Sequence, residues 1–388
     1  MINNICFVIL SSANYNSIKS VILNTKKEKK FKVSVVLGAS AINEKYGYTE
    51  KLLKKDKIKI DFRVDSLFLS NEPSSMARTT GETIIQLSII FNKIKPDIVF
   101  TVGDRHETLG IPIAASYLNI PVAHTMGGEV TGSIDENVRH AVTKLSHLHF
   151  VANKDSKKRV IRLGELKQNI FNVGCPRIDS IKEIIGKNNS KQILKKVSNS
   201  GLGDYKQIKK TDKYFVILVH PVTTEFNKQK INFLKVMEAV YKFKNKKIII
   251  WPNADAGSDI ISKQIRIMKE NNKLKDTKII KNLPLEDYIN LINNCGCLIG
   301  NTSSGIRDSA YLGVPVVNIG SRQNKRLRGK NVVDCSYEIK DIVKKISYQL
   351  TKKRYRGSFI YGDGNASKKI ISILKRIKFL NIQKLISY

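Results

Sequence analysis

Short runs of β-branched and aliphatic residues alternate along the whole chain with longer mixed segments, and this alternation constrains the fold more than any other feature. It is typical of βα units, which build parallel sheets covered by helices. In the first half, strands are expected at residues 5–10, 31–37, 97–102, 120–124, 148–153 and 169–174. In the second half, they are expected at residues 214–220, 247–253, 277–282, 297–301 and 314–320. The sequence therefore predicts an α/β fold.

The two sets of strands are separated by a polar segment, residues 180–213, that contains Gly, Ser and Asn and has few strand signals. A length of 388 residues favours two domains, and such a segment is typical of a boundary between them. We therefore expect two Rossmann-like domains facing across a cleft. The first covers residues 1–180, the linker covers 181–213, and the second domain covers 214–365.

The formal net charge of +35 raises the hypothesis of a nucleic-acid-binding protein. The excess is mostly Lys, spread over segments that read as helices, and no zinc-finger, RNP or helix-turn-helix signature accompanies it. We therefore interpret the charge as a solvated lysine-rich surface whose field draws anionic ligands, and we expect no nucleic-acid partner.

Targeting signals and cysteine usage both favour the cytoplasm. No run of eighteen apolar residues exists, and the N-terminus has neither a basic region nor a small-residue cleavage site, so no membrane contact is expected. The five cysteines have odd, scattered spacing that fits neither a disulfide framework nor a zinc ribbon. We expect reduced, buried thiols.

Five polar clusters directly follow expected strands: TVGDRHE, HTMGGEVTG, HPVTTE, WPNADAGSD and GNTSSGIRD. In parallel sheets, ligands bind beyond the carboxyl ends of the strands, where loops and helix N-termini gather. One such coincidence carries little weight, and five together predict ligand sites at these strand ends.

The cluster at residues 300–313 is suited to a diphosphate, because Ser303, Ser304 and Gly305 lie at a strand-to-helix turn with free N–H groups. Ordinary helix capping is the alternative, although capping needs a single hydroxyl residue. Asp308 is a candidate to accept hydrogen bonds from ribose hydroxyls, or to interact with the helix dipole.

Two further clusters supply candidate ligands in the second half. Residues 320–331 are rich in arginine, and Arg322, Arg326 or Arg328 could contact phosphate oxygens. His220 stands at a strand end, where it is either structural or functional.

Residues 101–150 gather most of the histidines together with several acids, of which Asp104, Glu129 and Asp135 are the candidates for acid–base work. Ser133 and Glu136 fit a capping box for the helix that follows. Capping does not explain Asp135, nor Arg139 one turn further on. His147 and His149 are expected to be structural.

Taken together, these blocks resemble the hydrolysing branch of the UDP-N-acetylglucosamine 2-epimerase family. The matching blocks stand in family order and are GDRHE, GGEVTGSIDENVRHAVTKLSHLHF, HPVTTE, PNADAG, GNTSSGIRDSAYLGVPVVNIGSRQ and YGDG. The resemblance implies a GT-B-like fold in which the last helix, within residues 366–388, returns to complete the first domain. It also implies that the second domain holds UDP and that the first carries the sugar chemistry.

The chemistry implied by the family is elimination of UDP across C1–C2, followed by addition of water with inverted configuration at C2. Asp104, Glu129 and Asp135 are then the candidate acids and bases, and Arg139 and His220 complete the predicted catalytic set. The predicted UDP-binding set is Asn253, Ser303, Ser304, Gly305, Asp308 and Arg322. Neither a metal nor a cofactor is expected, because positive side chains and a helix N-terminus can neutralise the leaving group.

Two positions depart from the family pattern. Ser12 or Ala13 stands where the family usually has an arginine in the first βα loop, and Met126 stands where the family usually has a carboxylate. We expect UDP-GlcNAc or a UDP-2,4-diacetamido-trideoxy sugar as substrate, and a homo-oligomer, either a dimer or a tetramer. The alternatives are a non-hydrolysing 2-epimerase, a GT-B glycosyltransferase, or a binding protein without catalysis.

Overall fold

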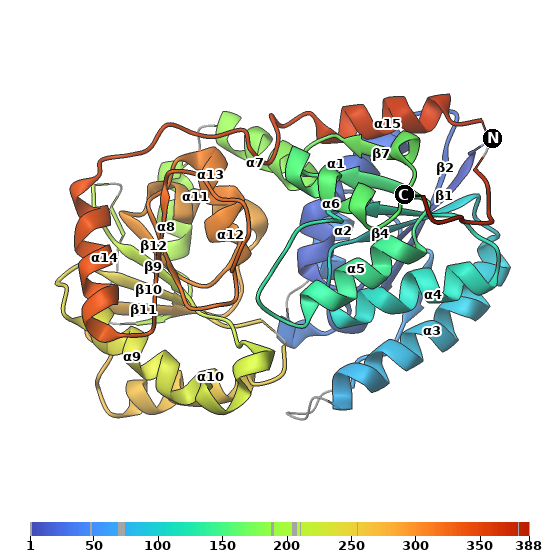
Figure 1. Cartoon of the computed structure of the whole chain (residues 1–388). Coiled ribbons are helices and arrows are strands. Elements are labelled where there is room, and N and C mark those ends of the chain that lie inside the picture. Colours follow the sequence, from blue (N-terminus) through green and yellow to red (C-terminus); the bar gives the residue numbers. More distant parts are fainter. Residues whose placement is uncertain are drawn as a thin grey trace. The chain divides into compact units, whose positions relative to one another are not determined.

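The structure is a computed structural model that describes residues 2–46, 49–68, 74–187, 190–203, 208–209, 211–253, 255–378 and 380–387. Its internal contacts divide the chain into two compact units. Unit 1 comprises Met1–Glu129, Ile134–Ser180 and Tyr361–Tyr388, and unit 2 comprises Val130–Ser133 and Ile181–Ile360. Each unit contains one sheet with helices around it (Figure 1).

A parallel sheet with strand order β3-β2-β1-β4-β5-β6-β7 forms the centre of unit 1. Its strands are β1 (Asn4–Ile9), β2 (Lys32–Gly38), β3 (Phe62–Val64), β4 (Ile98–Val102), β5 (Val122–Thr125), β6 (Leu148–Val151) and β7 (Ile170–Asn172). The strands expected in the first half are confirmed. The winding direction reverses between β1 and β4, and such a switch point is where sheets of this kind bind ligands.

Helices cover this sheet because its strands are apolar on both faces: every residue of β4 and β5, for example, is buried. The helices are α1 (Ser12–Lys26), α2 (Thr49–Lys55), α3 (Ser74–Ile94), α4 (Gly110–Tyr117), α5 (Asp135–Leu145), α6 (Lys154–Arg162), α7 (Pro176–Gly186) and α15 (Ala366–Arg376). Short 3₁₀ turns are η1 (Ala39–Ala41), η2 (Glu44–Tyr46), η3 (His106–Leu109) and η4 (Lys167–Asn169).

The last helix, α15, packs against α1, which confirms that the C-terminal helix returns to the N-terminal unit. Asp179 caps it, since the two carboxylate oxygens accept hydrogen bonds from the N–H groups of Ala366 (2.9 Å) and Ser367 (2.7 Å). The chain enters α15 past Gly362, whose φ is +115° and whose backbone lies against Gly174. A side chain at either glycine would collide with the other segment.

Unit 2 contains a sheet with the order β14-β13-β12-β9-β10-β11-β8. Its strands are β8 (Leu202–Gly203), β9 (Phe215–Leu218), β10 (Lys247–Ile250), β11 (Thr277–Ile280), β12 (Cys297–Gly300), β13 (Val316–Ile319) and β14 (Val332–Cys335). Among the strand pairs of unit 2 that the structure describes, only that of β8 with β11 is antiparallel. The strands expected in the second half are confirmed, and the winding direction reverses between β9 and β12.

The helices of unit 2 are α8 (Ser190–Ser198), α9 (Gln229–Tyr241), α10 (Ser258–Glu270), α11 (Leu285–Asn294), α12 (Ser303–Ile306), α13 (Asp308–Leu312) and α14 (Ile339–Thr351), with the 3₁₀ turn η5 (Thr223–Lys228). Segment 181–213, for which a linker was expected, thus carries α8 and β8 and groups with unit 2. The apolar stripe of α8, including Ile193, Leu194 and Val197, is buried, and α8 packs against α11.

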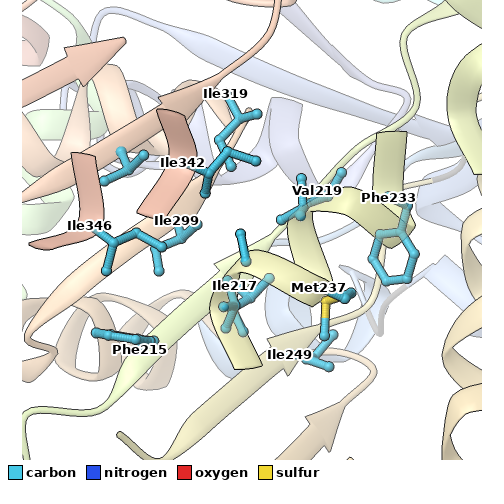
Figure 2. Close-up of a cluster of buried hydrophobic side chains, with 14 of the residues drawn as sticks. Phe215, Ile217, Val219, Phe233, Met237, Ile249, Ile299, Ile319, Ile342 and Ile346 are labelled. Atoms are coloured by element: carbon cyan, nitrogen blue, oxygen red, sulfur yellow. The ribbon is translucent and has the colours of Figure 1, made fainter. Parts of the chain in front are cut away.

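The core of unit 2 lies between the sheet and the helices α9 and α14 (Figure 2). Phe233 and Met237 stand one turn apart on α9, and Ile342 and Ile346 stand one turn apart on α14. This i, i+4 spacing places each pair on one helix face, where it meets the side chains of β9, β12 and β13.

All five cysteines are free and buried, as expected. Burial raises the pKa of Cys295 and of Cys335 to about 12, so these thiols stay protonated and unreactive near neutral pH. Within the described ranges, no helix is both long and apolar enough to cross a membrane.

Candidate active site

In unit 1, Asp104 follows β4 directly at the switch point of the sheet. Its carboxylate forms an ion pair with the guanidinium of Arg139, which α5 supplies. The Arg139 side chain has no exposed surface, whereas 21% of the Asp104 side chain is exposed. A buried guanidinium is costly without a partner, so this pair holds the Asp104 carboxylate at the strand end while part of it stays accessible.

Arg139 also donates a hydrogen bond from Nη1 to the main-chain oxygen of Glu129 at 2.9 Å. One side chain on α5 therefore holds both the loop after β4 and the loop after β5. The Glu129 side chain is itself only 2% exposed. The structure thus brings Asp104, Glu129 and Arg139 of the predicted catalytic set together in unit 1.

Asp135 is the first residue of α5 and is half-buried. Its negative charge is favourable there because a helix N-terminus carries a partial positive charge. The predicted capping box is wrong: the N-cap residue is Ile134, which makes no side-chain cap hydrogen bond, and Ser133 groups with unit 2. Glu136 instead contacts His140 one turn later, at 3.2 Å.

A second buried carboxylate, Glu107, lies in the turn after Asp104. The sequence analysis did not select it as a candidate site residue. Arg105 contacts it at 2.6 Å and His106 at 3.2 Å. Burial alone would raise the pKa of Glu107, but the charges of Arg105 and His106 lower it below the usual value. Glu107 therefore stays ionised and orients the turn that carries Asp104.

The histidines of this region serve structural roles, as expected for His147 and His149. The ring of His147 accepts a hydrogen bond from the N–H of Val122, and His149 contacts Glu165 at 3.0 Å. His124 at the end of β5 is fully buried and donates from Nε2 to the main-chain oxygen of Gly103 at 3.0 Å. Burial lowers the pKa of His124 to about 3, so its ring is neutral.

In unit 2, His220 and Asn301 follow the two strands that flank the switch point, β9 and β12. The Asn301 side chain accepts from the N–H of His220 at 2.7 Å and donates to the His220 carbonyl at 2.8 Å. Asn301 is 1% exposed, so both of its polar atoms are used internally. This pair of hydrogen bonds fixes the backbone of His220 against β12.

The tautomer of His220 follows from its neighbour Asn253, whose N–H donates to Nδ1 of the ring at 3.2 Å. Because Nδ1 accepts, the proton of the neutral ring lies on Nε2, which is then a hydrogen-bond donor. The Asn253 side chain contacts Asp255, and Asp255 lies 3.5 Å from Arg322. Arg322 also donates to the main-chain oxygen of Asn301 at 3.4 Å. The structure therefore groups Asn253, Arg322 and His220, which follow β10, β13 and β9, at the carboxyl edge of the sheet of unit 2.

The predicted UDP-binding residues in the turn after β12 differ in exposure. Ser303 begins α12 and is half-buried, whereas Ser304 is 8% exposed and donates to the carboxylate of Asp308 at 2.5 Å. Asp308 has no exposed surface, which differs from the expected contact with ribose. A Cβ on Gly305 would lie 3.1 Å from the Val316 side chain, so a larger residue here would be tight against β13.

Comparison with known proteins agrees with this geometry. The profile of the family described as UDP-N-acetylglucosamine 2-epimerase matches residues 23–375. The UDP-N,N'-diacetylbacillosamine 2-epimerase (hydrolyzing) of Legionella pneumophila is 34% identical over 377 residues, which cover 97% of each chain. The chain belongs to the UDP-N-acetylglucosamine 2-epimerase family. The predicted resemblance is thereby confirmed.

Two further similarities bear on activity and fold. The GDP/UDP-N,N'-diacetylbacillosamine 2-epimerase (hydrolyzing) of Campylobacter jejuni is 29% identical over 87% of this chain and 85% of its own. The crystal structure of the UDP-GlcNAc 2-epimerase of Neisseria meningitidis bound to UDP-GlcNAc superimposes with a TM-score of 0.80 at 19% identity. That alignment covers 96% of this chain and 100% of the other, and it confirms the predicted GT-B-like α/β class.

In the arginine-rich loop after β13, two of the three candidate arginines are bonded within the protein and are not free to contact a phosphate. Arg326 is 4% exposed and donates to the side chain of Gln323 at 2.8 Å. Arg328 donates to the carbonyl of Gln323 at 2.6 Å and pairs with Asp334. Both therefore hold the loop in shape, and Arg322 is the arginine at the strand end.

The two residues that depart from the family pattern both contact other parts of unit 1. Ser12 is the first residue of α1, and its hydroxyl lies 2.5 Å from that of Thr49. Met126 is 4% exposed with a φ of +67°, and its sulfur lies 3.7 Å from Sγ of Cys175. The thioether thus fills a buried position. Among the residues that the structure describes, no group of three or more His, Cys, Asp and Glu side chains is placed to hold a metal ion.

Proposed function

We propose that the chain is a hydrolysing nucleotide-sugar 2-epimerase, which converts a UDP-2-acetamido sugar and water into UDP and the free C2-epimer. The observation that carries this proposal is the ion pair of Asp104 with the buried Arg139, next to buried Glu129, at the ends of β4 and β5. It supplies oriented carboxylates where a proton must be removed and returned.

The reaction has two balanced steps. A carboxylate removes the proton from C2 while the C1–O bond breaks and its electron pair leaves with UDP, which produces a C1–C2 double bond. Water then adds across that bond, with its hydroxyl on C1 and a proton delivered to the opposite face of C2. The C2 proton is weakly acidic, so its removal must accompany the loss of UDP.

We assign the acid–base steps to unit 1, with Asp104, Glu129 and Asp135 as the candidate groups. Two carboxylates with different surroundings suit the two proton transfers, since one must take a proton and another must donate. Arg139 is buried and bonded inward, so it positions Asp104 and Glu129.

We assign UDP binding to unit 2, with Arg322, Asn253, Ser303 and His220 as the candidate contacts. A neutral His220 that donates from Nε2 can hydrogen-bond a phosphate oxygen and stabilise the departing diphosphate. Arg322 adds a positive charge, and its guanidinium can contact a phosphate while it remains near Asp255.

UDP-N,N'-diacetylbacillosamine is the first substrate to test, because the named activities of the Legionella and Campylobacter relatives use it. UDP-GlcNAc is the second. Five free cysteines are typical of a reducing compartment, so we place the reaction in the cytoplasm, which cell fractionation would check.

The test is incubation of the pure protein with each UDP-sugar in D₂O, with the products followed by NMR. The expected result is UDP, free sugar of inverted C2 configuration, and one deuterium at C2. A product that is still linked to UDP identifies a non-hydrolysing epimerase, and turnover only with an added acceptor identifies a glycosyltransferase. Binding of both sugars without turnover would contradict the proposal.

A further inference from the structure

The C-terminal tail, residues 380–387, follows α15 and is held against unit 1 by polar contacts. The ammonium group of Lys384 donates a hydrogen bond to the carbonyl of Lys144 at the end of α5, at 2.6 Å. The N–H of Ser387 donates to the carbonyl of Gly164, which follows α6, at 2.9 Å. The tail is therefore docked over the end of α5 and the loop after α6.

Glu165 is an acidic residue beside the docked tail, and its charge is offset by its neighbours. Its side chain is only 4% exposed and lies 2.7 Å from the ammonium of Lys384 and 2.8 Å from that of Lys144. The ring of His149 contacts the same carboxylate at 3.0 Å. Two ammonium groups surround one carboxylate, so this cluster has a net positive charge.

Exposed cations extend the positive charge around this cluster. Arg162 and Lys167 flank the loop that contacts the tail, and Lys378 precedes the tail. The sequence from residue 366 to residue 388 contains six Lys and Arg residues and no Asp or Glu. No acidic residue of this segment therefore reduces the positive charge of the surface.

Four aliphatic side chains of the same surface are exposed to solvent. Leu385 is 69% and Ile386 is 58% exposed in the tail, while Ile382 is 38% and Leu166 is 39% exposed. The tail and the loop after α6 are in direct contact, because a Cβ added to Gly164 would lie 2.5 Å from the Ile386 side chain. Single exposed aliphatic residues are common, whereas a group of them bordered by charges marks an interaction surface.

We define the tail patch as these exposed aliphatic and basic side chains: Arg162, Leu166, Lys167, Ile382, Leu385 and Ile386. We propose that the tail patch docks on the surface of an anionic phospholipid bilayer. The aliphatic side chains enter the boundary between headgroups and acyl chains, and the cations attract the headgroup phosphates. The cytoplasmic face of a membrane carries this negative charge.

The absence of membrane contact was expected from the absence of a spanning segment, and contact at the surface needs no such segment. The tail is far too short to cross a bilayer. A second copy of the chain is a poorer occupant, because two positive patches would repel each other. Nucleic acid offers phosphates but no hydrocarbon region for the aliphatic side chains. This inference is independent of the proposed catalytic function.

Co-sedimentation of the full chain with lipid vesicles tests the proposal. Vesicles of equal parts phosphatidylcholine and phosphatidylglycerol should bind the protein at least about tenfold more tightly than vesicles of phosphatidylcholine alone. Leu385→Ser combined with Ile386→Ser removes apolar surface at constant charge and should weaken this binding about tenfold. Arg162→Gln combined with Lys167→Gln should have a similar effect, and it leaves the docked tail unchanged.

A matched pair of variants separates the tail patch from the overall charge of the protein. Leu385→Glu with Ile386→Glu should abolish vesicle binding. Ile85→Glu with Ile89→Glu on α3, at sites that are 58% and 54% exposed, makes the same change in net charge and should lower the affinity less than about threefold.

Three results would overturn the proposal. The first is wild-type protein that does not bind the anionic vesicles. The second is an α3 variant that loses as much affinity as the glutamate variant of the tail, because overall charge would then explain the binding. The third is a serine variant that binds like wild type. If wild-type protein ignores vesicles but binds duplex DNA or itself, and the serine variant does not, the patch serves that other partner instead.

Discussion

The two units share one winding scheme but differ in the chemistry at its switch point. In each sheet the first parallel strand, β1 or β9, is followed by two strands on one side, and the next strand, β4 or β12, begins the other side. In unit 1 the loop after β4 holds an ionised pair, Asp104 with a fully buried Arg139. In unit 2 the loop after β12 holds an amide, Asn301, that clamps His220 through neutral hydrogen bonds.

This difference shows that the fold provides the position while the local side chains provide the chemistry. Burying a carboxylate costs desolvation free energy, which a charged partner such as a guanidinium offsets. A carboxylate held in this way is suited to proton transfer. Amides and N–H donors carry no net charge but can donate hydrogen bonds to an anion. They are therefore suited to binding a leaving group. The experiments below change one unit and use the other as the internal reference.

The largest effect is expected for Asp104→Asn in unit 1. Loss of the carboxylate should lower kcat about 1,000-fold or more, because an amide cannot exchange the proton, while the Kd for UDP stays within a few-fold. Turnover by NMR and UDP binding by calorimetry measure the two quantities. Equal loss of UDP affinity would remove the division of labour between the units, and Asp104→Glu controls for the unpaired Arg139.

The corresponding change in unit 2 is Asn301→Ala. It removes both hydrogen bonds that fix His220, each worth about 1–1.5 kcal/mol, so kcat/KM should fall about 10- to 100-fold with weaker UDP binding. A rise in KM with the pH profile unchanged would support a positioning role. Asn294→Ala on α11 is the control, since its side chain bonds only to a helix carbonyl at 2.7 Å in the described structure.

Most of the fold could be predicted from the sequence because buried parallel strands are short apolar runs with little ambiguity. The strands β3, β8 and β14 could not. β8 is two exposed residues, and β3 is the three-residue edge strand Phe62–Val64, so both depend on pairing with a neighbour distant in sequence. The expectation of a linker at residues 181–213 has a different cause, since the polar composition of this segment hides the buried apolar stripe of α8.

The candidate site was predictable in position but not in contacts. Residues after parallel strands gather at one edge, so Asp104, His220 and Ser303 could be identified. The sequence could not reveal that Arg139 turns inward to Asp104, or that Asn253 sets the tautomer of His220, because these contacts join separate loops. Nor could it tell the buried Ser304 and Asp308 from the more accessible Ser303, since neighbours on one helical turn differ only in which face meets the sheet.

A pH experiment distinguishes the units through His124. Burial lowers its native pKa to about 3, while the unfolded chain takes up the proton near pH 6.5. The unfolded state therefore binds more protons as pH falls below 6.5, so unit 1 loses stability between about pH 6.5 and 3. At pH 5 the loss is about 2 kcal/mol.

Hydrogen exchange of β4 and β5 peptides reports unit 1, and fluorescence of Trp251, the single tryptophan, reports unit 2. His124→Gln should remove the contribution of His124 to the pH dependence of stability, as measured by exchange in β4 and β5. The pH dependence of the Trp251 fluorescence should stay unchanged. His147 and His149, whose pKa values burial also lowers, keep contributing in both proteins, so the comparison is made at each pH. An identical slope in wild type and variant would contradict a neutral buried His124.

The smallest effects separate two adjacent serines in unit 2. Ser303→Ala should raise the Kd for UDP about tenfold, the value of one hydrogen bond to a charged oxygen, with no change in melting temperature. Ser304→Ala should do the reverse, because it leaves the buried carboxylate of Asp308 without this donor at a cost of roughly 1–3 kcal/mol in folding. Calorimetry with UDP measures the Kd of each variant, and thermal unfolding measures its melting temperature. If Ser304→Ala weakens UDP as much as Ser303→Ala at unchanged stability, both hydroxyls contact the nucleotide, and the turn must rearrange when UDP binds. If neither changes UDP affinity, the N–H donors and Arg322 hold the diphosphate without help from the hydroxyls.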